Sequence, residues 1–206
     1  MLFKTEDLLK DLIINESGKN IPSKIIRKKA KRFINQLGKR FQKAQDVIGK
    51  VRMGDNIHFV SAGEWSSHDV MVHLLNQTGP ADIYIATWSF TEIAARIILK
   101  QIEEKMIRNI YLLLDWRVKV RTPEVLGLLK FNISTIRLTQ CHAKVTAIVN
   151  DNWGVAVVGS ANYTNNPRIE AGVISCDQDL AEFHKKWISD CIDRLNPFEF
   201  KANETK

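Results

Sequence analysis

The sequence contains few cysteines and no long apolar segment. Three of its 206 residues are cysteine, at positions 141, 176 and 191, and no two of them form a CxxC pair. This excludes a disulfide framework and argues against a structural zinc site, so we expect reduced, mostly buried thiols. No apolar run is long enough for a membrane-spanning helix, and acidic residues interrupt the start of the chain, unlike in a secretory signal. We therefore expect a cytoplasmic protein with no membrane span.

Internal repeats and low-complexity segments are also absent. A content of 45% apolar and 26% charged residues fits one principal globular domain. His68 and His73 stand five apart, whereas side chains on one face of a helix are three or four apart. We therefore predict no metal pair there.

Positive charge is concentrated near the N-terminus. Residues 19–52 hold twelve Lys or Arg and one acid, Asp46, a local net charge of +11, so that the rest of the chain, at +7 overall, carries −4. Such a basic segment favours attachment to a polyanion.

Apolar residues recur every third or fourth position from Ile26 to Ile48, and Ser23 is a suitable N-cap. The spacing predicts a basic amphipathic helix. Its apolar side could pack on the domain or on a partner chain, while its basic side could contact nucleic acid or, as a third option, an anionic membrane surface. The residues that we assign to nucleic-acid contact are Lys24, Arg27, Lys28, Lys31 and Arg32, together with Arg117 farther along the chain.

Strand and helix patterns alternate from residue 55 onward. Strands are predicted over 56–61, 82–88, 109–115, 134–139, 142–149, 154–160 and 170–176, and helices over 67–77, 91–106, 122–130 and 178–194. A crossover helix joins the second and third strands, which should therefore be parallel. The pattern predicts an α/β fold, a mixed sheet between helices. We divide the chain into a basic helical extension (1–52), a domain (53–195) and a tail (196–206).

Two pairs of polar residues stand two apart on neighbouring predicted strands. His142 and Lys144 occur in CHAKVTAIV, and Ser160 and Asn162 in VGSANYT. Side chains two apart on a strand share a face, and the intervening VNDNWG predicts a hairpin turn. A turn centred near Asp151 would set His142 opposite Ser160. A cation, two hydrogen-bond donors and a nucleophilic nitrogen would then converge, which suits an anionic, tetrahedral ligand.

These residues resemble the phospholipase D superfamily, in particular its bacterial members with one catalytic motif per chain, many of which are nucleases. The family pattern is His-x-Lys, four residues, Asp, and then Gly-Ser-x-Asn, which HAK and GSAN match. The stretch IYIATWSFTEIAARIILKQIEEKMIRNIYLLLD resembles the family's first strand, helix and strand, so the resemblance covers residues 55–194. Val149 stands in place of the motif Asp, a supporting residue that some members lack.

The resemblance implies a metal-independent phosphodiesterase, in first place a nuclease, that needs no cofactor. His142 would attack phosphorus to form a phosphohistidine, and His142 of a second copy in a twofold dimer would protonate the leaving oxygen. Lys144, Ser160 and Asn162 would hold the phosphate, and Glu170 would orient the imidazole. The alternative is a catalytically silent protein of this fold that binds nucleic acid. A lipid substrate fits less well, because lipid-cleaving members usually carry two motifs in a longer chain.

The segment DWRVKVR, 115–121, directly follows a predicted strand. Ligands of α/β sheets often bind beyond the carboxyl ends of strands, so this segment could line a substrate groove. Ordinary surface packing explains its composition equally well.

Overall fold

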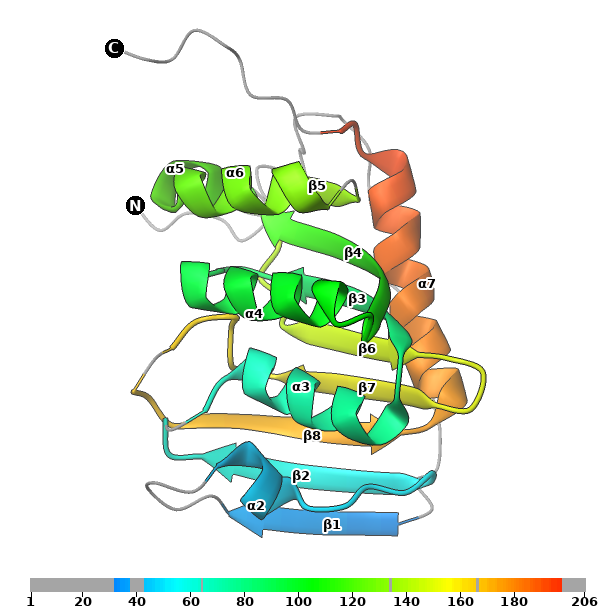
Figure 1. The fold of residues 1–206 in the computed structure, drawn as a ribbon. Helices are drawn as coiled ribbons and strands as arrows, with labels where there is room; N and C mark the ends of the chain where they lie inside the picture. The colour runs from blue at the N-terminus through cyan, green and yellow to red at the C-terminus, as the bar shows by residue number, and fades with distance from the viewer. Residues whose placement is uncertain (1–31, 38–42, 64, 134, 166, 198–206) are drawn as a thin grey trace, which may run out of the picture.

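One mixed β-sheet runs through the protein. The computed structural model describes residues 32–37, 43–63, 65–133, 135–165 and 167–197. In these residues eight strands pair in the order β1-β2-β8-β7-β6-β3-β4-β5 (Figure 1). The strands are β1 (Arg32–Leu37), β2 (Asp55–Ser61), β3 (Ala81–Thr87), β4 (Ile107–Asp115), β5 (Ile136–Thr139), β6 (Val145–Val149), β7 (Gly154–Gly159) and β8 (Glu170–Cys176). The helices are α2 (Ala44–Ile48), α3 (Ser67–Thr78), α4 (Glu92–Glu103), α5 (Val118–Arg121), α6 (Pro123–Asn132) and α7 (Gln178–Arg194).

The predicted α/β fold with a mixed sheet is confirmed. Strands β3 and β4 are parallel and joined through α4, as a crossover helix requires. The pairs β1–β2 and β4–β5 are also parallel, and the remaining neighbours are antiparallel. Each strand and helix predicted between residues 56 and 194 is present, with shifts of no more than three residues at its ends.

Helices cover both faces of the sheet. Helices α2, α3, α4 and α6 lie over one face, and α7 crosses the other behind β6 and β7 (Figure 1). On the first face the core includes the fully buried Leu74 of α3 and Ile98 of α4, and on the second face it includes Ala147 of β6 and Ile188 of α7. Burying a leucine or isoleucine side chain contributes about 1.5–3 kcal/mol. These two layers hold the ends of β3, β6 and β7 in place, and the candidate site lies at those ends.

Local sequence explains where the principal helices begin and end. Helix α3 starts with a capping box, in which Ser66 is the N-cap and Asp69 accepts a hydrogen bond from the Ser66 amide at 2.8 Å. It ends at Gly79, whose positive φ of 74° suits a glycine. Helix α7 starts at Asp177, whose carboxylate accepts from the amides of Asp179 and Leu180.

The predicted amphipathic helix is wrong over Arg32–Leu37, which form strand β1 beside β2. Pairing with β2 satisfies backbone groups that a helix would have satisfied internally, and the Arg32 guanidinium lies 2.5 Å from the buried carboxylate of Asp55. Among the described residues of this segment, helix is present over Ala44–Ile48, where Ala44, Val47 and Ile48 are buried in the domain core. Tertiary pairing therefore overrides the helical periodicity of this segment.

Several predictions concern residues beyond the described part of the chain. Lys24, Arg27, Lys28 and Lys31 lie there, as does most of the predicted tail. The division of the chain at residue 52 stays a prediction, while α2 packs into the same core as the rest of the domain. Among the described helices, none combines the length and apolar character that crossing a bilayer requires.

Candidate active site

The hairpin that carries both polar pairs has a register different from the predicted one. Strand β6 pairs Val145 with Val158, and the Gly159 amide donates to the Lys144 carbonyl oxygen at 3.2 Å. Lys144 therefore lies opposite Gly159, and the predicted placement of His142 opposite Ser160 is wrong. His142 and Lys144 also precede β6 instead of lying within a strand.

The side chain of Asn150 explains this register. Its Oδ1 accepts hydrogen bonds from the backbone amides of Asn152, at 3.0 Å, and Trp153, at 2.8 Å, while the backbone amide of Asn150 donates to the Trp153 carbonyl oxygen at 2.9 Å. The turn thus spans four residues, and its centre lies after Asp151 instead of at it. A shift of one residue changes which side chains share a face of the sheet.

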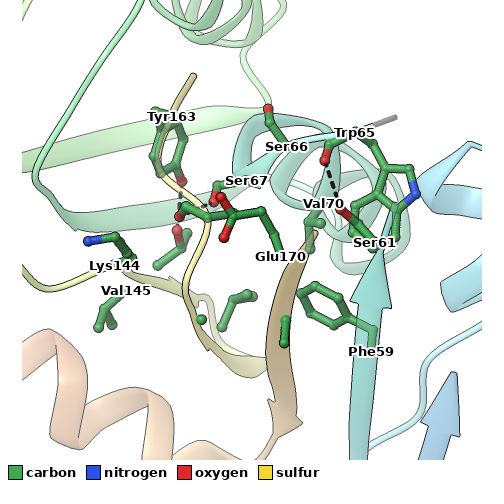
Figure 2. A pocket seen from close by; sticks show the side chains of 15 residues that line it. Phe59, Ser61, Trp65, Ser66, Ser67, Val70, Lys144, Val145, Tyr163 and Glu170 are labelled. Carbon is green, nitrogen blue, oxygen red and sulfur yellow. Dashed lines mark hydrogen bonds between the residues drawn. The ribbon is translucent and has the colours of Figure 1, made fainter. Parts of the chain in front are cut away.

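His142 and Lys144 have different surroundings. The His142 imidazole is exposed, and the Lys144 Nζ donates to the His142 carbonyl oxygen at 3.0 Å. Lys144 is half-buried, and this burial lowers its pKa, while the Glu170 carboxylate opposes the shift. A small cavity of about 20 Å³ lies between α3 and the sheet, and both Lys144 and Glu170 line it. Figure 2 shows Glu170 reaching into the space between Tyr163, Ser67 and Lys144.

Ser160 and Glu170 are hydrogen-bonded to each other. Gly159 pairs with Gly172, which brings the end of β7 beside the start of β8. The Ser160 hydroxyl donates to the Glu170 carboxylate and accepts from the Ala171 amide at 3.0 Å. Within the described residues Glu170 makes no hydrogen bond with His142. The sequence analysis therefore predicted that Ser160 and Glu170 lie in the same site, but it did not predict the hydrogen bond between them.

Asn162 is anchored from the carboxyl end of β3. The Thr87 hydroxyl donates to Asn162 Oδ1 at 3.3 Å, which orients the amide so that its NH₂ group points away from Thr87. The next residue, Tyr163, is fully buried, stacks on Phe90 at 5.1 Å and lies 2.6 Å, hydroxyl to hydroxyl, from Thr146. Burial raises the pKa of Tyr163, so its hydroxyl stays neutral. The Gly-Ser-x-Asn segment thus leads into a rigid anchor that sequence reasoning missed, although an aromatic residue directly after the motif was visible.

An aromatic and cationic cluster lies beside His142. The Trp88 ring meets the His142 ring edge-on with centroids 5.7 Å apart. The guanidinium carbons of Arg121 and Arg117 lie 4.6 Å and 5.3 Å from the Trp88 ring centroid. Because Thr87 and Trp88 are adjacent, one end of β3 contacts both Asn162 and His142. Sequence reasoning named Arg117 as a nucleic-acid contact and the segment 115–121, which includes Arg121, as a possible groove lining, but it missed Trp88.

Arg117 is held by the buried carboxylate of Asp115. Arg117 Nε lies 2.6 Å from Asp115 Oδ1, and the Cys141 amide donates to Asp115 Oδ2 at 3.0 Å. Burial acts to raise the pKa of Asp115, but the hydrogen bonds from Arg117 and Cys141 outweigh it, so the pKa is lowered. Asp115 thereby ties the backbone just before His142 to the end of β4. Arg117 makes an internal ion pair, which partly neutralises the charge predicted to contact nucleic acid.

Val149 lies far from this cluster. Val149 is buried at the last position of β6, whereas Lys144 precedes the first position, and Val149 pairs with Gly154. Five residues of strand correspond to about 16 Å. The replacement of the family's Asp by Val149 therefore removes no group that faces His142.

The described part of the chain holds no cluster of three metal-ligating side chains. His73 Nε2 lies 2.8 Å from the Gly49 carbonyl oxygen, and His68 packs, buried, against the Ser66 hydroxyl. The two histidines are thus engaged separately.

Comparison with known proteins supports this fold. No family model and no curated protein matches the sequence. NucT from Helicobacter pylori is similar in structure, with a TM-score of 0.55 at 20% identity over 69% of this chain and 98% of its own. Nuc from Salmonella typhimurium, a phospholipase D family member, gives a TM-score of 0.52 at 17% identity over 70% and 98%. Polyphosphate kinase from Porphyromonas gingivalis gives 0.50 at 13% identity over 71% of this chain and 27% of its own. The resemblance carried by the motifs is thus confirmed at the level of structure: the chain has the fold of the phospholipase D family member Nuc.

Proposed function

We propose that the protein is a metal-independent phosphodiesterase of the phospholipase D superfamily, in first place a nuclease, with His142 as its nucleophile. The observation that carries this proposal is the exposed His142 imidazole beside Lys144 and the oriented amide of Asn162, at one edge of a fold shared with NucT and Nuc. A neutral imidazole, an ammonium and an amide donor are the groups that phosphodiester cleavage through a covalent intermediate requires.

The proposed reaction has two steps. In the first step a neutral His142 attacks phosphorus, the bond to the leaving oxygen breaks, and the protonated His142 of a second copy gives its proton to that oxygen. In the second step water attacks the phosphohistidine, the phosphorus–nitrogen bond breaks, and the second imidazole takes up the proton released by water. Each chain supplies one such histidine, so we infer that the complete site needs a twofold dimer.

Lys144 and Asn162 bind the nonbridging phosphate oxygens in this proposal. Lys144 Nζ uses one donor on the His142 carbonyl oxygen, which leaves two donors for phosphate. The Thr87 hydroxyl holds Asn162 Oδ1, which leaves the NH₂ group to donate. A phosphodiester anion beside Lys144 also offsets the burial that lowers the Lys144 pKa, because an opposite charge favours the ammonium form.

Ser160 and Glu170 act together. We propose that Ser160 contributes a donor to phosphate and that Glu170 orients an imidazole, yet in the structure the Ser160 hydroxyl donates to Glu170. Because Ser160 has a single O–H donor, its role requires this bond to open when substrate binds. Ser160→Ala and Glu170→Gln should therefore both lower the rate, and the double variant should lose less than the product of the two losses.

Cleavage of plasmid and of single-stranded DNA and RNA in EDTA tests the proposal. His142→Ala should abolish cleavage, because it removes the group proposed to carry the phosphoryl intermediate, whereas His58→Ala, at an exposed histidine on β2, should not. Denatured protein quenched during turnover should carry an acid-labile phosphoryl group only when His142 is present. Cleavage that survives His142→Ala would remove His142 as the nucleophile.

The alternative, a catalytically silent protein that binds nucleic acid, predicts salt-sensitive binding without cleavage. Sedimentation equilibrium with the full chain tests the dimer. A monomer that cleaves at full rate would contradict the shared site.

A further inference from the structure

Two positively charged side chains, those of Arg117 and Arg121, lie against the same indole ring. Arg121 N donates to the Arg117 carbonyl oxygen at 2.8 Å, so the two residues stand one helical turn apart on α5. Both guanidinium groups approach the Trp88 ring. Like charges four apart on a helix repel each other, and an anion nearby relieves this repulsion.

Asp115 neutralises only one of these two charges. Its carboxylate binds Arg117, whereas Arg121 makes no ion pair with an acid in the part of the chain that the structure describes. Arg121 is exposed, and its guanidinium carbon lies over the Trp88 ring. A guanidinium in such a cation–π contact keeps N–H donors available, which can bind phosphate in a bidentate manner.

This cation lies close to the proposed nucleophile. The Trp88 ring contacts both His142 and Arg121, so the guanidinium carbon is no more than about 10 Å from the imidazole centroid, the sum of the two separations. That distance is within the span of one or two nucleotides of an extended strand. A strand whose scissile phosphate lies at His142 can therefore bring its next phosphate to Arg121.

We propose that Arg121, positioned by Trp88, binds the phosphate that flanks the scissile one, so that the substrate is a polynucleotide strand and not an isolated diester. This inference rests on the proposed function for the identity of the scissile phosphate. It assigns a separate role to each arginine. Arg117 binds Asp115, which holds the backbone before His142, and Arg121 binds the phosphate next to the scissile one.

Binding of a labelled single-stranded oligonucleotide, measured by fluorescence anisotropy over a series of salt concentrations, tests the proposal without requiring catalysis. Arg121→Ala should raise Kd about tenfold and lower the slope of log Kd against log salt by about 0.7, the value of one phosphate contact to a single strand. Arg108→Ala is the matched control, because Arg108 is an exposed arginine at the other end of β4 and its loss changes the net charge equally. It should change neither quantity.

Two further variants separate position from charge. Arg121→Lys should keep the salt slope but lose part of the affinity, because an ammonium lacks the planar fork. Trp88→Phe should retain more affinity than Trp88→Ala, because a phenyl ring still supports the guanidinium. Equal Kd values and equal salt slopes for Arg121→Ala and Arg108→Ala would overturn the proposal, as would the absence of any binding by the unaltered protein.

Catalysis supplies an independent readout. The loss of kcat/KM caused by Arg121→Ala should be about tenfold larger on an oligonucleotide than on bis(4-nitrophenyl) phosphate, a diester with no flanking phosphate. Equal losses on the two substrates would contradict the flanking subsite. If the unaltered protein hydrolyses neither substrate, the proposed function fails, and the binding measurement still decides the role of Arg121.

Discussion

The hydroxyl pair of Tyr163 and Thr146 allows a double-mutant cycle on the anchor of the candidate site. The two oxygens are 2.6 Å apart, and both side chains are buried. Tyr163→Phe or Thr146→Val removes one hydroxyl with little change of shape. The first variant leaves the Thr146 hydroxyl without this partner, and the second leaves the Tyr163 hydroxyl only the weak acceptor Sδ of Met71, at 3.8 Å. An orphaned buried hydroxyl costs about 1–3 kcal/mol, so each single variant should lower the free energy of unfolding by about 1–2 kcal/mol.

The double variant removes both hydroxyls and therefore leaves no orphan. Its loss should be smaller than the sum of the single losses, with a coupling energy of about 1 kcal/mol. Urea unfolding followed by circular dichroism measures each free energy of unfolding. In thermal unfolding, each kcal/mol that is lost should lower Tm by about 2–4 °C for a protein of this size. Additive losses would show that the two hydroxyls do not stabilise each other, and the account of this anchor would be wrong.

Two other predictions concern the strand ends around the site. Because the pKa of Asp115 is lowered in the folded protein, its carboxylate stabilises the fold above the unfolded pKa of about 3.9, and this contribution is lost as the pH falls through the folded pKa. Asp115→Asn should cost about 2 kcal/mol at neutral pH in urea unfolding and progressively less in acid, and an equal cost at both would refute the charged pair with Arg117. Gly159→Ala should lower Tm, because an added Cβ would lie 2.8 Å from the Ala171 carbonyl oxygen, whereas Gly127→Ala in α6, which meets nothing within 4 Å, should be neutral or stabilising. A higher Tm for Gly159→Ala would contradict the close strand approach that positions Ser160.

The candidate site was only partly predictable. The spacing of His142, Lys144, Ser160 and Asn162 indicated one shared edge of the sheet, since strand alternation and a hairpin turn are properties of short sequence windows. The bond between Ser160 and Glu170 was not predicted, because it depends on which strand lies beside β7. The positions of Trp88 and Arg121 depend in the same way on the neighbouring ends of β3 and β4.

Local pattern alone determined most of the helices and strands between residues 55 and 194. Helix α7 has the predicted bounds, because a cap at Asp177 and apolar side chains at helical spacing act within a few residues of each other. Tertiary structure decided the rest. Arg32–Leu37 form a strand, although the spacing of apolar residues there favours a helix. The segment pairs with the backbone of β2, and Arg32 forms an ion pair with the buried carboxylate of Asp55. The hairpin register likewise depended on the hydrogen bonds that the Asn150 side chain accepts from the backbone of the turn. The spacing of apolar residues indicates which face of a segment can be buried. Strand pairing and register depend on partners that only the folded chain brings into contact.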